Sequence, residues 1–131
     1  MSAEVKRAVT GSLVKLLVHT REDRGMVLLP FETRCLQRWE IHELVTTDQA
    51  EAAAGDRIDR VGFLGFAEIE TGGVVERGDA LIADGRRIGT VLGFDDCHFP
   101  NHLNVIVATE RLETATTAGL ALGGAMRFEP A

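Results

Sequence analysis

Short runs of strand-forming residues, each ended by a glycine or a charged turn, limit this chain to a sheet of many short strands. The clearest case is residues 80–94, where Asp84-Gly85 separates two apolar runs. Both positions accept the positive φ that a two-residue hairpin turn needs, so a tight hairpin is predicted there. Residues 39–45 alternate apolar and polar side chains, which is typical of a half-buried strand. The polar face, which includes His42, points either to the lumen of a barrel or to solvent.

Other segments extend the same pattern. The spacing of apolar residues in 8–19 fits either a helix or a strand. We favour a strand and predict that it forms a hairpin with residues 26–31. Further strands are predicted over residues 58–70, 103–108 and 125–128. Gly62 and Gly65 within one strand favour the sharp coiling that a barrel requires.

A single helix is predicted over residues 47–55, where an alanine run follows Thr47 and Asp48 and Gly55 can end it. Many short strands and one short helix predict a mainly β fold. We expect a small closed or nearly closed antiparallel β-barrel of about seven to eight strands, since closure leaves no exposed strand edge.

Size and charge exclude several classes of protein. The 131 residues suffice for one domain, residues 1–131, and are too few for two. The net charge is −6 and the basic residues are scattered, so nothing attracts a nucleic acid. Residues 1–7 contain no signal-like segment, and no apolar run could span a bilayer. We expect a cytoplasmic protein with no membrane partner, in which Cys35 and Cys97 stay reduced.

Four runs in the C-terminal half form an ordered series. They are Gly78-Asp79-Ala80-Leu81, Thr90-Val91-Leu92-Gly93, residues 101–105 and Met126-Arg127-Phe128-Glu129. This series, within residues 62–129, resembles the IIA component of the sorbitol (glucitol) phosphotransferase system, which is a small β-barrel. That family accepts phosphate on a His in the strand before the hairpin, whereas the matching residues 62–68 contain no His. The resemblance implies the barrel and does not carry the phosphocarrier activity to this chain.

Residues 93–102 concentrate the chemistry of the chain between two predicted strands. The candidate catalytic residues are His98, His102, Asp96 and Cys97, and the candidate ligand-binding residues are His42, Glu68, Asp95 and Asn101. A His beside a carboxylate can move protons near neutral pH, and the candidate pairs are His98 with Asp95 or Asp96 and His102 with Glu68. Cys97 is either a nucleophile activated by His102 or His42 or a small buried side chain.

The same loop also offers metal ligands, because Asp96, Cys97, His98 and His102 all have donor atoms that zinc accepts. Pro100 disfavours the helix that would align the two histidines. Neither Cys-x-x-Cys nor His-Glu-x-x-His occurs. A polar loop whose side chains bond its own backbone is therefore preferred, and no metal or other cofactor is predicted.

These observations predict a β-barrel that binds a small polar molecule at one barrel mouth through the loop of residues 95–102. An enzyme that uses His98 or His102 for general acid–base chemistry is included in this hypothesis. One alternative is a non-catalytic assembly module in the form of a homo-oligomeric barrel. A second alternative is a metal-dependent enzyme.

Overall fold

A computed structural model describes residues 5–131 and contains twelve β-strands and no helix in that range. The strands are β1 (Val9–Leu16), β2 (Thr20–Arg21), β3 (Met26–Val27), β4 (Thr33–Leu36), β5 (Ile41–Thr47), β6 (Arg57–Ile58), β7 (Val61–Thr71), β8 (Gly73–Glu76), β9 (Ala80–Ala83), β10 (Arg86–Asp95), β11 (Asn104–Ala108) and β12 (Ala125–Glu129). The mainly β prediction is confirmed.

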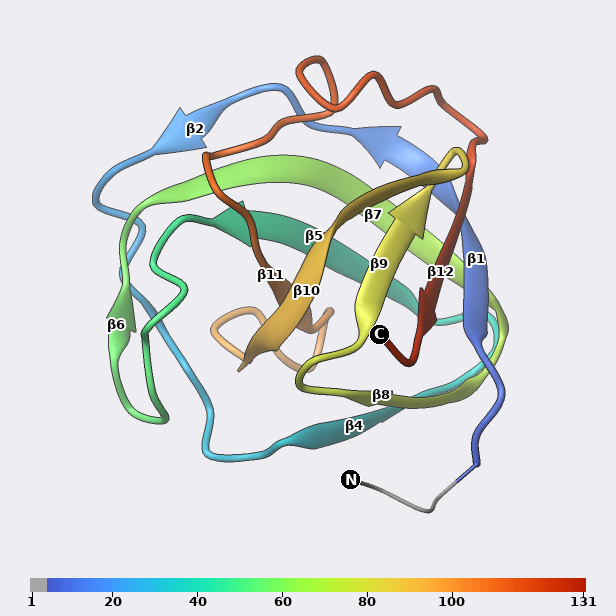
Figure 1. Cartoon of the computed structure of the whole chain (residues 1–131), viewed down its shortest axis with the longest axis horizontal. Helices are drawn as coiled ribbons and strands as arrows, with labels where there is room; N and C mark the ends of the chain where they lie inside the picture. Colours follow the sequence, from blue (N-terminus) through green and yellow to red (C-terminus); the bar gives the residue numbers. More distant parts are fainter. Residues whose placement is uncertain (1–4) are drawn as a thin grey trace.

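Seven of these strands form a closed ring in the order β1-β12-β9-β10-β11-β5-β7, and β7 pairs back with β1 (Figure 1). Strand β2 extends β7, while β3–β6 and β4–β8 form separate small pairs. The pairing of β5 with β11 is parallel, and the other six contacts in the ring are antiparallel. The expected all-antiparallel arrangement is therefore wrong. Strand directions cannot alternate all the way around a closed ring of seven, so at least one parallel contact is required.

Two apolar clusters lie on opposite faces of the ring. All seven ring strands contribute to the first cluster, which includes Leu13, Leu44 and Phe128 and fills the interior. The second cluster includes Val45 and Ile106, whose chain neighbours point inward, and is covered from outside by Met26 of β3 and Ile58 of β6. Because side chains alternate along a strand, adjacent residues serve different clusters. Strands β5 and β11 are thus buried on both faces near their centres.

The predicted hairpin at Asp84-Gly85 is present between β9 and β10. Asp84 has φ 50° and Gly85 has φ 76°, which are the positive values that the dipeptide permits. The last strand, β12, pairs with both β1 and β9 and so links the two ends of the chain into the ring.

Glycine allows the backbones of β1 and β7 to approach at the closure. A Cβ on Gly11 would lie 2.3 Å from the carbonyl oxygen of Glu68, and one on Gly65 would lie 2.0 Å from that of Lys15. Real side chains cannot occupy such positions, so the coiling predicted from the glycines of residues 58–70 has a steric basis.

The short helix predicted over residues 47–55 is absent; Thr47 ends β5 and turns follow it. The Gln49 side-chain oxygen accepts hydrogen bonds from the backbone N–H groups of Asp59 and Arg60, which holds this segment as a loop. Of the alanine run, Ala52 packs against the outer apolar cluster and is only partly buried, and propensity alone does not stabilise so short a helix.

The hairpin predicted between residues 8–19 and 26–31 is also wrong. Strand β1 pairs with β12 and β7, whereas β3 pairs with β6 and only its two residues are in strand conformation. Instead, the charged segment between them begins with β2, which pairs with β7. Within residues 5–131, no helix is long and apolar enough to cross a membrane.

Candidate functional site

A row of side chains crosses the outer face of the ring near one end of four adjacent strands. The row consists of Asp95 on β10, Asn104 on β11, Glu43 on β5 and Phe66 on β7, which are partners in register. A direct chain neighbour of each belongs to the interior cluster, so alternation directs the row outward. The polar groups therefore lie on the outside of the ring wall.

The loop between β10 and β11 folds back over this row and adds two histidines to it. The backbone N–H of His102 lies 3.4 Å from the carbonyl oxygen of His98, and the two rings are 5.1 Å apart between centroids. The His102 ring meets Phe66 edge-on at 5.0 Å, and its Nε2 lies 3.6 Å from Oε1 of Glu43. Three possible ligand atoms lie within 4.8 Å of one another, one each from Glu43, His98 and His102.

Polar atoms at the centre of this cluster are buried without hydrogen bonds. The Glu43 side chain is 8% exposed, and none of the hydrogen bonds among residues 5–131 involves its carboxylate. Two atoms beside it, Nε2 of His102 and Oδ1 of Asn104, are fully buried without a hydrogen-bond partner. Leaving such groups unsatisfied is costly, and native proteins seldom do so without a ligand or a functional reason.

Burial has opposite effects on the two central ionisable groups. It raises the pKa of Glu43, although the positive charge of Arg24 acts in the other direction. It lowers the pKa of His102, and the charge of nearby His42 lowers it further. Both shifts favour neutral forms, as expected where the effect of burial outweighs that of nearby charges and hydrogen bonds.

Arg24, in the turn between β2 and β3, borders the cluster. Its Nη2 lies 2.7 Å from Nε2 of His98 and 3.6 Å from Sγ of Cys97. A guanidinium can only donate, so Nε2 of His98 accepts this hydrogen bond and is unprotonated. Burial and then the Asp95 carboxylate raise the pKa of Cys97, which favours the protonated thiol.

Asp95 supports the loop through its hydrogen bonds. Oδ1 accepts hydrogen bonds from the Cys97 N–H and from the Asn104 amide, and Oδ2 accepts one from the Val27 N–H. Burial alone would raise its pKa, but these hydrogen bonds and that of the Cys97 thiol outweigh burial and lower it. Asp95 therefore ties the loop and β3 to the end of β10.

The predicted pairings within the loop differ from those observed. His98 lies against Arg24 rather than Asp95 or Asp96, and His102 lies against Glu43 rather than Glu68. Asp96 is exposed, and Asn101 places its side-chain amide 3.1 Å from Nδ1 of His102. The loop does bring His98, His102 and Asn101 together, as the sequence suggested.

His42 and Glu68 have other surroundings. His42 lies on the interior face of β5, where Nδ1 accepts a hydrogen bond from the Leu103 N–H and Nε2 lies 3.0 Å from Oε1 of Glu40. It is buried, so of the two directions that the sequence left open for this face, interior and solvent, His42 takes the interior one. Glu68 is half-buried on β7 opposite Ile41.

Glu43 and Arg24 are the site residues that the sequence analysis missed. Glu43 lies between His42 and Leu44 in the alternating run of residues 39–45. Glu43 lies on the strand face opposite His42, and this position was a usable signal. The His42 face was taken as the polar one, so Glu43 was not selected. Nothing in the sequence connects Arg24 with His98, 74 positions away.

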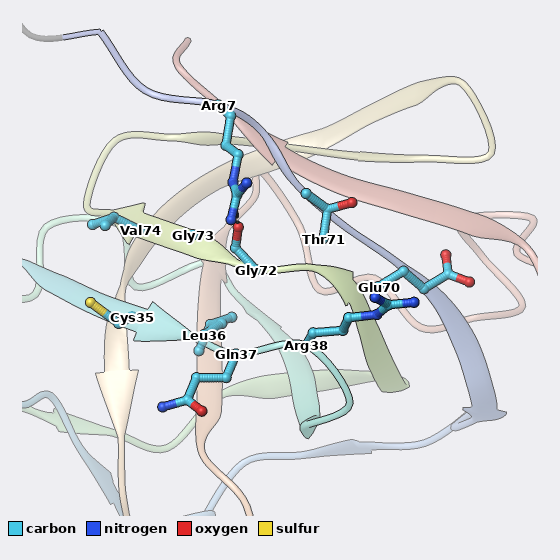
Figure 2. Close-up of a pocket in the computed structure, with 10 residues that line it drawn as sticks. All are labelled: Arg7, Cys35, Leu36, Gln37, Arg38, Glu70, Thr71, Gly72, Gly73 and Val74. Atoms are coloured by element: carbon cyan, nitrogen blue, oxygen red, sulfur yellow. Dashed lines mark hydrogen bonds between the residues drawn. The ribbon is translucent and has the colours of Figure 1, made fainter.

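One hollow of the described surface is separate from this cluster. It has a volume of about 580 Å³ and lies where β4 and β8 meet the turn after β7 (Figure 2). Arg7 reaches across it and donates a hydrogen bond from Nε to the Gly72 carbonyl oxygen. Arg38, Gln37 and Thr71 also line it, and none of the residues selected from the sequence does.

Fold and site together define the class: an all-β protein with a closed ring of strands and a cluster of one carboxylate and two imidazoles on its outer face. The chain belongs to the family DUF6917, described as a family of unknown function, whose model matches residues 3–129. No curated protein and no solved structure matches it.

Proposed function

We propose that this protein is a small β-barrel that binds a divalent transition-metal ion through Glu43, His98 and His102 and acts on a small molecule at that ion. The observation that carries this proposal is the buried pair formed by the Glu43 carboxylate and Nε2 of His102. These atoms are 3.6 Å apart, and neither has a hydrogen bond among residues 5–131. A cation between them would satisfy both.

The geometry is close to what such an ion requires. Metal–ligand bonds of about 2.1 Å in a tetrahedral site place ligand atoms about 3.4 Å apart. Glu43 and His102 already have that spacing, so only His98 has to move inward. His98 is exposed on its loop and can do so by side-chain rotation. Its Nε2 carries the hydrogen bond from Arg24, so the ion either uses Nδ1 or displaces the guanidinium.

The neighbouring residues suit a ligated histidine. A metal-bound imidazole usually donates its other N–H to an oxygen, and the Asn101 amide lies beside Nδ1 of His102. An amide can present either its nitrogen or its oxygen by a flip, so Asn101 can accept this bond once Nε2 holds the ion. Two imidazoles and one carboxylate are a ligand set for Zn²⁺ or Fe²⁺ that leaves coordination positions open. An ion held in this way supplies Lewis-acid chemistry to a bound molecule.

Metal content and affinity test this proposal. Purified protein is stripped with a chelator, reloaded with Co²⁺ or Zn²⁺, and measured by elemental analysis and titration calorimetry. We expect one ion per chain, and a loss of affinity of at least about 100-fold in Glu43→Gln and His102→Ala. Glu68→Gln is the matched control, because it removes a half-buried carboxylate outside the cluster. Equal affinity in Glu43→Gln and Glu68→Gln would contradict the assignment.

Metal-free proton transfer is the second candidate, and one observation favours it. The hydrogen bond from Arg24 requires a neutral imidazole with a lone pair on Nε2 of His98, and that nitrogen can act as a general base once the guanidinium turns towards a bound anion. The two candidates differ in their response to chelation. Binding or turnover of a small molecule that survives removal of all metal, and that is lost in His98→Ala, would favour proton transfer.

A further inference from the structure

The guanidinium of Arg24 faces the proposed metal site without a carboxylate partner. Among residues 5–131, no ion pair involves Arg24, whereas its sequence neighbour Arg21 is paired with Asp23. Its contacts are the weakly polar Cys97 thiol and one nitrogen of His98. Both contacts place the guanidinium beside His98, at the edge of the cluster.

The turn that carries Arg24 is fixed in place. The Arg24 N–H donates to the Asp59 carbonyl oxygen at 3.1 Å, and the Gly25 N–H donates to Oδ1 of Asp59 at 2.9 Å. Gly25 has φ 72°, a value that glycine adopts without strain. The backbone therefore holds the guanidinium at the edge of the cluster, and the side chain keeps several donors for a further partner.

We infer that the molecule bound at this site is a small carboxylate that places one oxygen on the metal ion and the other on Arg24. This inference rests on the metal site proposed above. A carboxylate matches the planar fork of a guanidinium and is also a good ligand for a divalent ion.

The local charge favours a monoanion. The divalent ion and Arg24 together carry three positive charges, and ionised Glu43 and Asp95 carry two negative charges, so one further negative charge neutralises the site. A phosphate dianion would overcompensate. The loop residues 96–101 around Arg24 are exposed, which fits a small ligand bound at the surface rather than one enclosed in a cavity.

The visible absorption of the Co²⁺-loaded full-length protein reports on both steps. Loading alone tests the metal site, and subsequent titration with acetate, with acetamide as the neutral control, tests the carboxylate. We expect acetate to change the spectrum and acetamide to leave it unchanged. In Arg24→Gln, Co²⁺ should still bind, while acetate should bind about tenfold or more weakly. Arg21→Gln removes the same charge three residues away and should behave as the unmodified protein.

The outcomes separate the two proposals. Failure to bind Co²⁺ overturns the metal site and the inference that rests on it. Normal Co²⁺ loading with no response to acetate, or with equal acetate affinity in Arg24→Gln and Arg21→Gln, overturns the carboxylate assignment alone. Tighter binding of inorganic phosphate than of acetate also overturns it, because the site would then be selective for a dianion.

Discussion

Glu43 is a residue whose position weakens the fold unless something binds to it. Its carboxylate is buried on the outer face of β5, has no hydrogen bond among the described residues, and has a pKa raised by burial. A carboxyl group with a raised pKa holds its proton more tightly in the folded state than in the unfolded one. Its contribution to stability therefore falls as the pH rises from the unfolded-state pKa through the folded-state pKa.

Glu43→Gln should therefore make the metal-free protein more stable at pH 7, by roughly 1 kcal/mol, while it abolishes metal binding. Urea unfolding at pH 7 and pH 4 measures this, and the gain should shrink at the lower pH, where the native carboxyl is protonated. A substitution that weakened the metal-free fold at pH 7 would show that Glu43 is a structural residue.

Asp95 has the opposite behaviour, because hydrogen bonds hold its pKa below the ordinary value. Its contribution to stability is complete above the unfolded-state pKa, about 4, and is lost as the pH falls through the lower folded-state pKa. Asp95→Asn should cost about 1–3 kcal/mol at pH 7, since it weakens three charge-assisted hydrogen bonds. The difference from the unmodified protein should shrink below pH 4, as measured by urea unfolding. A difference that is constant with pH would contradict the assigned role.

At the scale of elements, the segment that contains β3 depends on β10. The Leu29 N–H donates to the Phe94 carbonyl oxygen, and the Val27 N–H donates to Asp95. Leu28 packs directly over Gly93, where an added Cβ would lie 2.5 Å from its Cδ1. Because Leu28 is fully buried, it has little room to move away. This contact fixes the outer apolar cluster and the turn that carries Arg24.

Gly93→Ala should cost about 1–3 kcal/mol because the new methyl group displaces Leu28. Thermal and urea unfolding of the single variants and of the double variant with Leu28→Ala form a cycle that checks the cause. In the Leu28→Ala background the obstruction is gone, so Gly93→Ala should cost much less there. Additive costs would show that the glycine is needed for another reason.

At the scale of the whole molecule, closure protects the strands of the ring. Strand β12 lies between β1 and β9, so every ring strand has two neighbours. A chain that ends at residue 124 would leave one edge of β1 and one edge of β9 unpaired, and unpaired edges bind other chains. We expect that variant to form aggregates that light scattering detects under conditions where the full chain does not. An unassociated, cooperatively folded variant would show that β12 is dispensable.

How far the sequence predicts the fold depends on the range of the interactions involved. The Asp84-Gly85 hairpin and the alternation of residues 39–45 are local, and strands β9 and β10 occur where they were predicted. Strand β5 begins two residues after the predicted start, because Trp39 lies in a turn with φ 79°. The helix over residues 47–55 and the hairpin of residues 8–19 with 26–31 were also inferred locally, and distant partners overrode both. The likeness to the sorbitol phosphotransferase component stays a prediction.

The amino-acid sequence by itself determined the mainly β character of the protein, because hydrophobic alternation and turn chemistry act over a few residues. It also located the loop that contains His98 and His102, because the polar side chains of that loop are close together in the sequence. Only the tertiary structure decided that Glu43, and not Glu68 or Asp96, faces His102, and that Arg24 reaches His98. The first contact depends on the register in which strands distant in the chain pair, and a shift of one residue would turn Glu43 into the interior. The second depends on the packing of the Arg24 turn against the loop after β10.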